Sequence, residues 1–122
     1  MNIVAFDSST LILLAKINLL KKVYLYYGKI VIPQQVFKET VEKGKNENKE
    51  DAYLIEKEIK NKRIDILKIK NKNTLNEILG NFKCNLGEAE SISLAIDRKS
   101  TLFTDDSEAI KICKVYEVDF IT

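Results

Sequence analysis

The sequence contains no histidine among its 122 residues, and this absence excludes several classes of chemistry. Hydrolysis by Ser-His-Asp or Cys-His groups, His-based general acid–base catalysis and His-ligated zinc all need an imidazole. Cysteine is scarce as well. Cys84 and Cys113 lie far apart and form no CxxC motif, so we interpret them as buried free thiols in a reducing compartment.

Long apolar runs and a strong net charge are also missing. The longest apolar run, LILLA within residues 9–16, is far too short to span a membrane, and Met1 is followed by NIVAFD without the charged start of a signal peptide. We therefore expect a cytoplasmic protein that does not enter a membrane. The formal net charge of +2 does not by itself indicate a nucleic-acid-binding protein, although a local basic stripe would be enough.

The length of the chain and its 45% of apolar residues predict one domain, residues 1–122, with a real core. Short apolar runs predict strands at 2–6, 29–33, 64–69, 101–104 and 118–121. Helical spacing predicts helices at 11–28 (preceded by the N-cap types DSST and interrupted near Asn18), 34–44, 52–63, 74–79 (ended by Gly80), 86–100 and 106–116. The charged stretch 43–51 predicts a loop. This order predicts an α/β fold, an open parallel sheet of about four or five strands with helices on both faces.

Acidic residues from four segments fall at the carboxyl edge of that sheet, where function gathers in such folds. The first predicted strand ends at Asp7, and the fourth ends before Asp105 and Asp106. The other acids lie in the first turns of helices that begin at this edge: Glu39, Glu88 and Glu90.

Each of these acids also has a simpler explanation. An aspartate between a strand and a helix is a common N-cap, and glutamates in a first helical turn are favoured by the helix macrodipole. Glu39 would fit an exposed helix face. Capping, however, accounts for one acid per helix start. It does not account for Glu39, both glutamates of GEAE and the second of two adjacent aspartates together.

An acidic cluster without histidine or cysteine partners is a hard-oxygen site that suits Mg²⁺ or Mn²⁺. Without a cation these carboxylates would repel one another, and one or more of their pKa values would rise. With a cation the expected chemistry is phosphodiester hydrolysis, in which the metal polarises a phosphoryl oxygen, activates water and steadies the leaving oxygen.

Four motifs, in order and spacing, resemble those of PIN-domain ribonucleases: VAFDSSTLILLAKI, VIPQQVFKETV, LGEAESISLA and LFTDDSEAI. The likeness is to the PIN-like branch with a G-E-A-E signature, and it covers nearly the whole chain. It implies a PIN-like fold that is short at its C-terminal end. Asp7 matches the first family acid, a direct metal ligand supported by Ser9. Glu39 matches the second acid, and either Glu88 or Glu90 matches the third.

The last motif matches the family's T-x-D, which implies Thr104 as a supporting residue and Asp106 as the fourth acid, with Asp105 as its substitute. The resemblance implies an endoribonuclease that cleaves RNA with Mg²⁺ or Mn²⁺. It also implies the toxin of a toxin–antitoxin pair, an antitoxin protein as partner, and a homodimer.

Two other hypotheses compete with this one. A degenerate PIN-like module would bind RNA or a protein partner without cleavage. A phosphorelay receiver would also cluster aspartates on such a sheet, but it needs paired acids after the first strand and a lysine after the last. Further residues could serve RNA, either as phosphate contacts or by base stacking, although solvated surface is the commoner role of such basic residues and packing or an interface that of such tyrosines: Lys16, Arg98, Lys99, Lys111, Lys114, Tyr24, Tyr26 and Tyr27.

Overall fold

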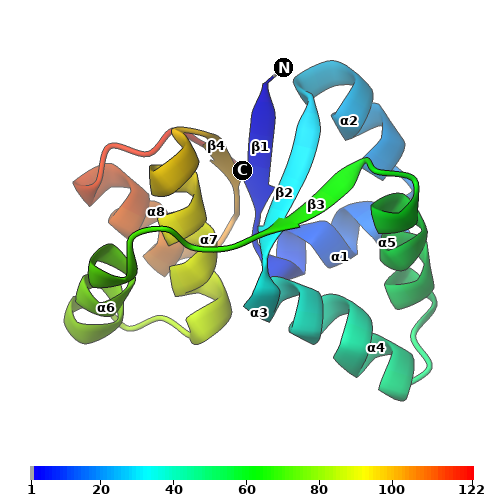
Figure 1. Ribbon diagram of the computed structural model, residues 1–122, viewed down its shortest axis with the longest axis horizontal. Helices are drawn as coiled ribbons and strands as arrows, with labels where there is room; N and C mark the ends of the chain where they lie inside the picture. The colour runs from blue at the N-terminus through cyan, green and yellow to red at the C-terminus, as the bar shows by residue number, and fades with distance from the viewer. Residues whose placement is uncertain (1) are drawn as a thin grey trace.

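Five short apolar runs form one parallel sheet in the computed structural model, which describes residues 2–122. The strands lie in the order β3-β2-β1-β4-β5, and every neighbouring pair is parallel (Figure 1). The strands are β1 (Ile3–Phe6), β2 (Lys29–Pro33), β3 (Ile64–Leu67), β4 (Thr101–Phe103) and β5 (Phe120–Ile121). The predicted open parallel α/β sheet is thus confirmed.

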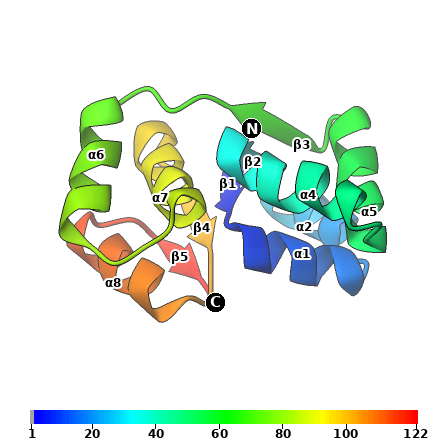
Figure 2. The same ribbon diagram turned by 90° about the horizontal axis from the view of Figure 1, so that it is seen from below.

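Helices cover both faces of the sheet, as predicted. On one side lie α1, α2, α5 and the helix that follows β2; on the other lie α6, α7 and α8 (Figure 2). The helical segments are α1 (Ser8–Lys16), α2 (Leu20–Tyr27), α3 (Gln34–Phe37), η1 (Lys38–Glu42), α4 (Lys43–Asn46), α5 (Glu50–Lys60), α6 (Lys72–Asn81), α7 (Leu86–Arg98) and α8 (Ser107–Val115).

Alternation along the central strands explains the two layers of the core. In β1, Val4 and Phe6 pack with α1, α2 and α5, whereas Ala5 packs with α7 and α8. Phe6 stacks on Phe103 of β4 with ring centroids 4.6 Å apart. Tyr27 of α2 packs edge-on against Phe103 at 5.0 Å. Two buried faces on one sheet require apolar residues on both sides of each central strand, which is what β1 supplies.

Asn18 separates two short helices, as the sequence predicted. Its φ of 60° lies in the left-handed region, which ends α1 and redirects the chain into α2. In α2, the side chain of Tyr26 is 82% exposed and lies on the surface, whereas Tyr27 packs against Phe103.

The helix after β2 is longer than predicted, and the expectation of a loop at 43–51 was wrong. Helical backbone continues to Asn46, and only residues 47–49 connect it to α5. Gly44 is buried, and a Cβ there would lie 2.7 Å from Cβ of Ala52, so close packing of α4 on α5 stabilises both helices. The charged composition of residues 43–51 did not indicate this contact, because it forms between two helices and depends on the tertiary fold.

Gly80 does not end α6, contrary to the prediction. The helix continues through Asn81, and Phe82 is its C-cap. A glycine in a last helical turn costs about 1 kcal/mol relative to alanine. Burial of Leu75 and Ile78 against α7 and the sheet offsets that cost.

Candidate metal centre

The candidate site lies where β1 and β4 end side by side. Phe6 pairs with Phe103, so Asp7 and Thr104 leave the sheet at adjacent positions. The strand order reverses around β1, because β2 follows on one side and β4 lies on the other. In open α/β sheets, such a switch point at the carboxyl ends of the strands forms a natural crevice.

Asp7 is buried, with 3% of its surface exposed, and its carboxylate is held by two donors. Oδ1 accepts the backbone N–H of Thr10 at 3.0 Å, which makes Asp7 the N-cap of α1. Oδ2 accepts the hydroxyl of Thr104, which is also fully buried. Oγ1 of Thr104 in turn accepts the backbone N–H of Asp106 at 3.2 Å. Thr104 thus ties the two aspartate segments together.

Glu39 reaches the same place from a π-helical segment, η1. The hydroxyl of Ser8 donates to its Oε1 at 2.5 Å, and Nε2 of Gln35 lies 3.4 Å from its Oε2. The backbone of α7 passes so close that a Cβ on Gly87 would overlap Oε1 of Glu39. Thr40 donates its hydroxyl to the carbonyl of Val36 at 2.8 Å, within the turn that widens here. π-turns inside α-helices are rare and occur often at functional sites.

Glu88 and Asp106 are the third and fourth acids of the site. Glu88 belongs to a capping box with Asn85, in which each side chain accepts the other's backbone N–H, at 3.2 and 2.8 Å. Asp106 caps α8 by accepting the N–H of Ala109 at 2.9 Å. Asp106 is therefore the N-cap of α8, and Glu88 lies in the first turn of α7.

The two carboxyls also affect each other's proton affinity. Burial, and then a hydrogen bond to Asp106, raise the pKa of Glu88 to about 7. The same hydrogen bond, followed by the N–H of Ala109, lowers the pKa of Asp106 below its usual value. At neutral pH, near this pKa, Glu88 is therefore protonated in roughly half of the molecules, and Asp106 is ionised.

These four acids surround one cavity of about 210 Å³. Its lining carries only neutral and acidic side chains: Asp7, Ser8, Ser9, Glu39, Asn85, Glu88 and Asp106. Across residues 2–122, however, no three acidic or cysteine side chains converge closely enough to form a ready-made metal cluster. The acids are instead held in pairs with hydroxyl, amide or carboxyl partners.

Two of the predicted acids lie outside this cavity. Asp105 is exposed and does not line it, although its neighbour Asp106 does. Glu90 turns to α3, where its Oε1 accepts the backbone N–H of Gln35 at 3.2 Å. The supporting residues lie close by, because Ser9 lines the cavity and Thr104 contacts both aspartate segments.

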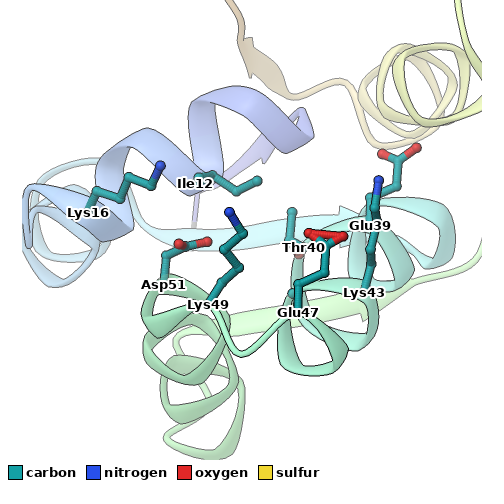
Figure 3. Close-up of a pocket in the computed structure, with 9 residues that line it drawn as sticks. Ile12, Lys16, Glu39, Thr40, Lys43, Glu47, Lys49 and Asp51 are labelled. Atoms are coloured by element: carbon teal, nitrogen blue, oxygen red, sulfur yellow. The ribbon is translucent and has the colours of Figure 1, made fainter.

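A second cavity, of about 190 Å³, borders the first and shares Glu39 with it. Figure 3 shows Lys16 extending from α1, Lys43 from α4 and Lys49 from the following loop around this hollow. None of these three lysines makes an ion pair within residues 2–122. Glu47 and Asp51 also line the hollow, so its charges are mixed.

Several residues at the site were not predicted from the sequence. Ser8 and Gln35 bind Glu39, Asn85 caps α7 beside Glu88, and Gly87 makes room for Glu39. Asn85 carried a signal, because an asparagine three residues before a glutamate at a helix start is close to a capping-box pattern. The other three depend on how α1, α3 and α7 meet, and local sequence gives no sign of that.

Comparison with known families agrees with this geometry. The sequence profile described as PIN domain matches residues 3–121, so the chain belongs to the PIN domain family. No curated protein matches the sequence significantly.

Several solved structures share the fold. VapBC2 from Rickettsia felis, bound to a DNA fragment from its promoter, is 17% identical with a TM-score of 0.66, and 98% of this chain and 97% of that chain are covered. A toxin–antitoxin complex from Klebsiella pneumoniae is 13% identical with a TM-score of 0.68, covering 98% and 96%. A domain of unknown function from Methanocaldococcus jannaschii is 22% identical with a TM-score of 0.62, covering 99% and 90%.

Proposed function

We propose that this protein is a metal-dependent endoribonuclease that hydrolyses RNA phosphodiester bonds with Mg²⁺ or Mn²⁺. One observation carries the proposal: four carboxylates from four separate segments surround one cavity that no lysine or arginine lines. A basic side chain would neutralise such a cluster in an ordinary surface network. Here the charge is left for a cation, and an all-oxygen donor set suits a hard divalent ion.

Asp7, Glu39, Glu88 and Asp106 are the proposed ligands and catalytic acids. When bound, the cation would polarise a phosphoryl oxygen, activate water and steady the leaving oxygen. Thr104 and the N–H of Thr10 fix the carboxylate of Asp7, and Ser8 fixes that of Glu39. Glu88 binds a cation as a carboxylate, so its raised pKa of about 7 makes cation binding compete with protonation, and Asp106 must give up its hydrogen bond to Glu88. Ser9, which lines the cavity, is the proposed supporting residue for Asp7.

RNA as the substrate is supported by the neighbouring hollow. Lys16, Lys43 and Lys49 line the second cavity, which shares Glu39 with the acidic cavity, so they can meet phosphates on one side of the bond that is cut. Family membership supports the same reaction, because PIN domains of the toxin type are nucleases in general.

We further infer a toxin of a toxin–antitoxin pair, acting in the cytoplasm as a homodimer with an antitoxin protein as partner. Two of the similar structures are toxin–antitoxin assemblies. Both cysteines are free, as in a reducing compartment, and no helix within residues 2–122 has the length and apolarity needed to cross a bilayer. Co-expression with the product of an adjacent small gene, followed by co-purification and mass measurement, tests partner and dimer together.

Cleavage of labelled single-stranded RNA tests the reaction itself. The assay compares wild type, Asp7→Asn and Glu42→Gln with Mn²⁺, with and without EDTA. Glu42 is a matched control, because it is exposed on the same helical run as Glu39 but does not line the acidic cavity. Wild type and Glu42→Gln should cleave only without EDTA, and Asp7→Asn should lose more than the roughly 10–100-fold that outer-shell changes cost.

Cleavage by Asp7→Asn in the presence of EDTA would contradict the proposal. The competing function, a PIN-like module that binds RNA without cutting it, is favoured by one observation: the carboxylates are paired rather than converged. RNA binding by wild type with no product at any Mn²⁺ concentration would establish that function instead.

A further inference from the structure

The two glutamates of the GEAE motif face different neighbours. They lie two residues apart on α7, and successive helical residues are rotated by about 100°, so the two side chains cannot share one face. Glu88 lines the acidic cavity, whereas Glu90 accepts the backbone N–H of Gln35 at 3.2 Å. Family likeness left both as candidates for one role, but the geometry divides them.

The N–H that Glu90 accepts has no partner within its own helix. Gln35 is the second residue of the helical run that starts at Gln34, and the first N–H groups of a helix have no intrahelical acceptor. The N-cap, Pro33, makes no side-chain cap hydrogen bond. Glu90 therefore performs the capping from another helix, and its negative charge suits the positive end of the macrodipole.

The helix capped in this way carries Glu39 one turn later. Gln35 links the two positions, because its Nε2 lies 3.4 Å from Oε2 of Glu39. α7 approaches the same helix a second time at Gly87, whose backbone leaves no room for a Cβ beside Glu39. Through Glu90, α7 thus holds the start of the helix that carries Glu39. Gly87 of α7 lies against the carboxylate of Glu39, and Glu88 of α7 lines the cavity.

We propose that Glu90 is a positioning residue: by capping Gln35 it fixes the helix that carries Glu39 and so aligns Glu39 with Glu88 across the acidic cavity. The proposal rests on the proposed metal site for its effect on function. Its structural part, the Glu90–Gln35–Glu39 linkage, is independent of that site. Glu90 needs only an oxygen that accepts a hydrogen bond, so a glutamine can replace it, whereas a ligand to a hard cation needs the carboxylate.

The test compares Glu90→Gln, Glu90→Ala and Glu88→Gln with wild type. In the metal-free protein, NMR follows the amide proton of Gln35 and the carboxyl carbon of Glu39; calorimetry then gives Mn²⁺ affinity. Glu90→Gln should keep both NMR signals and the affinity. Glu90→Ala should shift both signals and weaken Mn²⁺ binding by about tenfold, a typical effect of losing an outer-shell partner. Glu88→Gln should weaken binding further without moving the Gln35 signal.

Loss of Mn²⁺ affinity in Glu90→Gln equal to that in Glu88→Gln would overturn the proposal, because it would make Glu90 a ligand. A Glu90→Ala protein that melts earlier but keeps the Glu39 signal and full affinity would overturn it too, because Glu90 would then be only a structural cap. If wild type binds no Mn²⁺, the proposed function fails. The Glu39 signal in metal-free Glu90→Ala still decides the positioning role, which falls if that signal does not move.

Discussion

From the sequence alone, Asp7 and Asp106 could each be either a helix cap or a cation ligand; in the structure one side chain can serve both roles. Each caps a helix through one carboxylate oxygen, at Thr10 and Ala109 respectively, and each also lines the acidic cavity. A carboxylate has about four lone-pair positions, so a cap occupies only part of its accepting capacity. The adjacent residues Asp105 and Asp106 therefore have different roles, because only Asp106 lines the cavity.

The pair Asp105 and Asp106 gives a residue-scale prediction. Asp106→Asn keeps an N-cap, since asparagine caps as well as aspartate, but loses the negative charge toward the cavity. It should retain its melting temperature and lose Mn²⁺ affinity and RNA cleavage. Asp105→Asn, which changes an exposed side chain, should affect neither. Calorimetry and the RNA assay check both, and a greater loss in Asp105→Asn would reverse the assignment.

Two glycines give a second residue-scale prediction: an alanine should impair the site at Gly87 but stabilise the protein at Gly80. In Gly87→Ala the new methyl would overlap Oε1 of Glu39, so the carboxylate must move, and Mn²⁺ affinity should fall by about tenfold. In Gly80→Ala the methyl meets no atom within 4 Å, and the free energy of unfolding should rise by up to about 0.5–1 kcal/mol. Urea titration and calorimetry measure both effects, and unchanged Mn²⁺ affinity in Gly87→Ala would contradict the crowding at Glu39.

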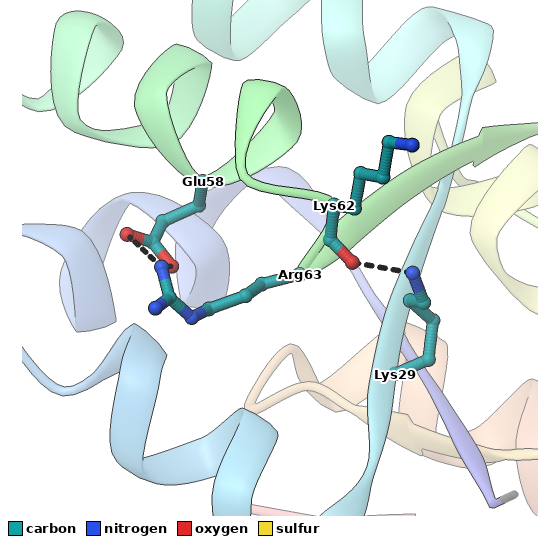
Figure 4. Close-up of polar contacts among 4 residues, drawn as sticks. All are labelled: Lys29, Glu58, Lys62 and Arg63. Carbon is teal, nitrogen blue, oxygen red and sulfur yellow. Dashed lines mark hydrogen bonds and ion pairs between the residues drawn. The ribbon is translucent and has the colours of Figure 1, made fainter.

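At the scale of elements, two helices supply Glu39 and Glu88, half of the four acids of the site. The run from Gln34 to Asn46 places Glu39 by widening into a π-turn, and α7 supplies the cap, the small residue and Glu88. The connection from α5 to β3 has a different task, which is to hold the sheet edge. There Arg63 pairs with Glu58 at 3.2 Å, and Nζ of Lys29 donates to the carbonyl of Lys62, as Figure 4 shows.

Arg63→Ala should therefore affect stability but not the site. The Arg63 and Glu58 side chains are only 25% and 14% exposed, so their ion pair is better shielded than a surface pair, and its loss should lower the free energy of unfolding by about 1 kcal/mol. Lys111→Ala removes a looser pair, 4.0 Å from Glu108 with a 73% exposed lysine, and should cost less than about 0.5 kcal/mol. Urea titration compares them; equal losses, or a change in Mn²⁺ affinity, would contradict this division.

The whole molecule brings its acids together through topology, and this part could be predicted from sequence. Continuous apolar runs separated by helices imply a parallel sheet, whose carboxyl ends share one edge, so Asp7 and Asp106 were expected at the same edge; that they are neighbours follows from the pairing of β1 with β4. The choice between Glu88 and Glu90 could not be predicted, because it depends on the rotation of α7 against α3. The continuation of the helix beyond Gly44 to Asn46 and the contact of Ser8 with Glu39 likewise arise from tertiary packing.

The second cavity, which borders the acidic cavity at Glu39, gives a prediction for the whole molecule. The double variant Lys16→Ala/Lys49→Ala should weaken RNA binding and lower the salt dependence of affinity, by about one unit of slope for each phosphate that the protein no longer neutralises. Lys21→Ala/Lys22→Ala removes the same charge from α2, which lines neither cavity, and is the matched control. Fluorescence anisotropy over a salt series compares the two double variants. Identical slopes would show that the lysines of the second cavity do not contact the phosphates of RNA.

The central claim is that the four carboxylates form one divalent-cation site, and Mn²⁺ titration by calorimetry measures it most directly. Wild type and Glu42→Gln should bind with the same affinity, because Glu42 is exposed and outside the cavity. Glu39→Gln should bind more than about tenfold more weakly, because it removes a proposed ligand rather than an outer partner. Equal affinity in all three proteins, or no binding by wild type, would contradict the claim.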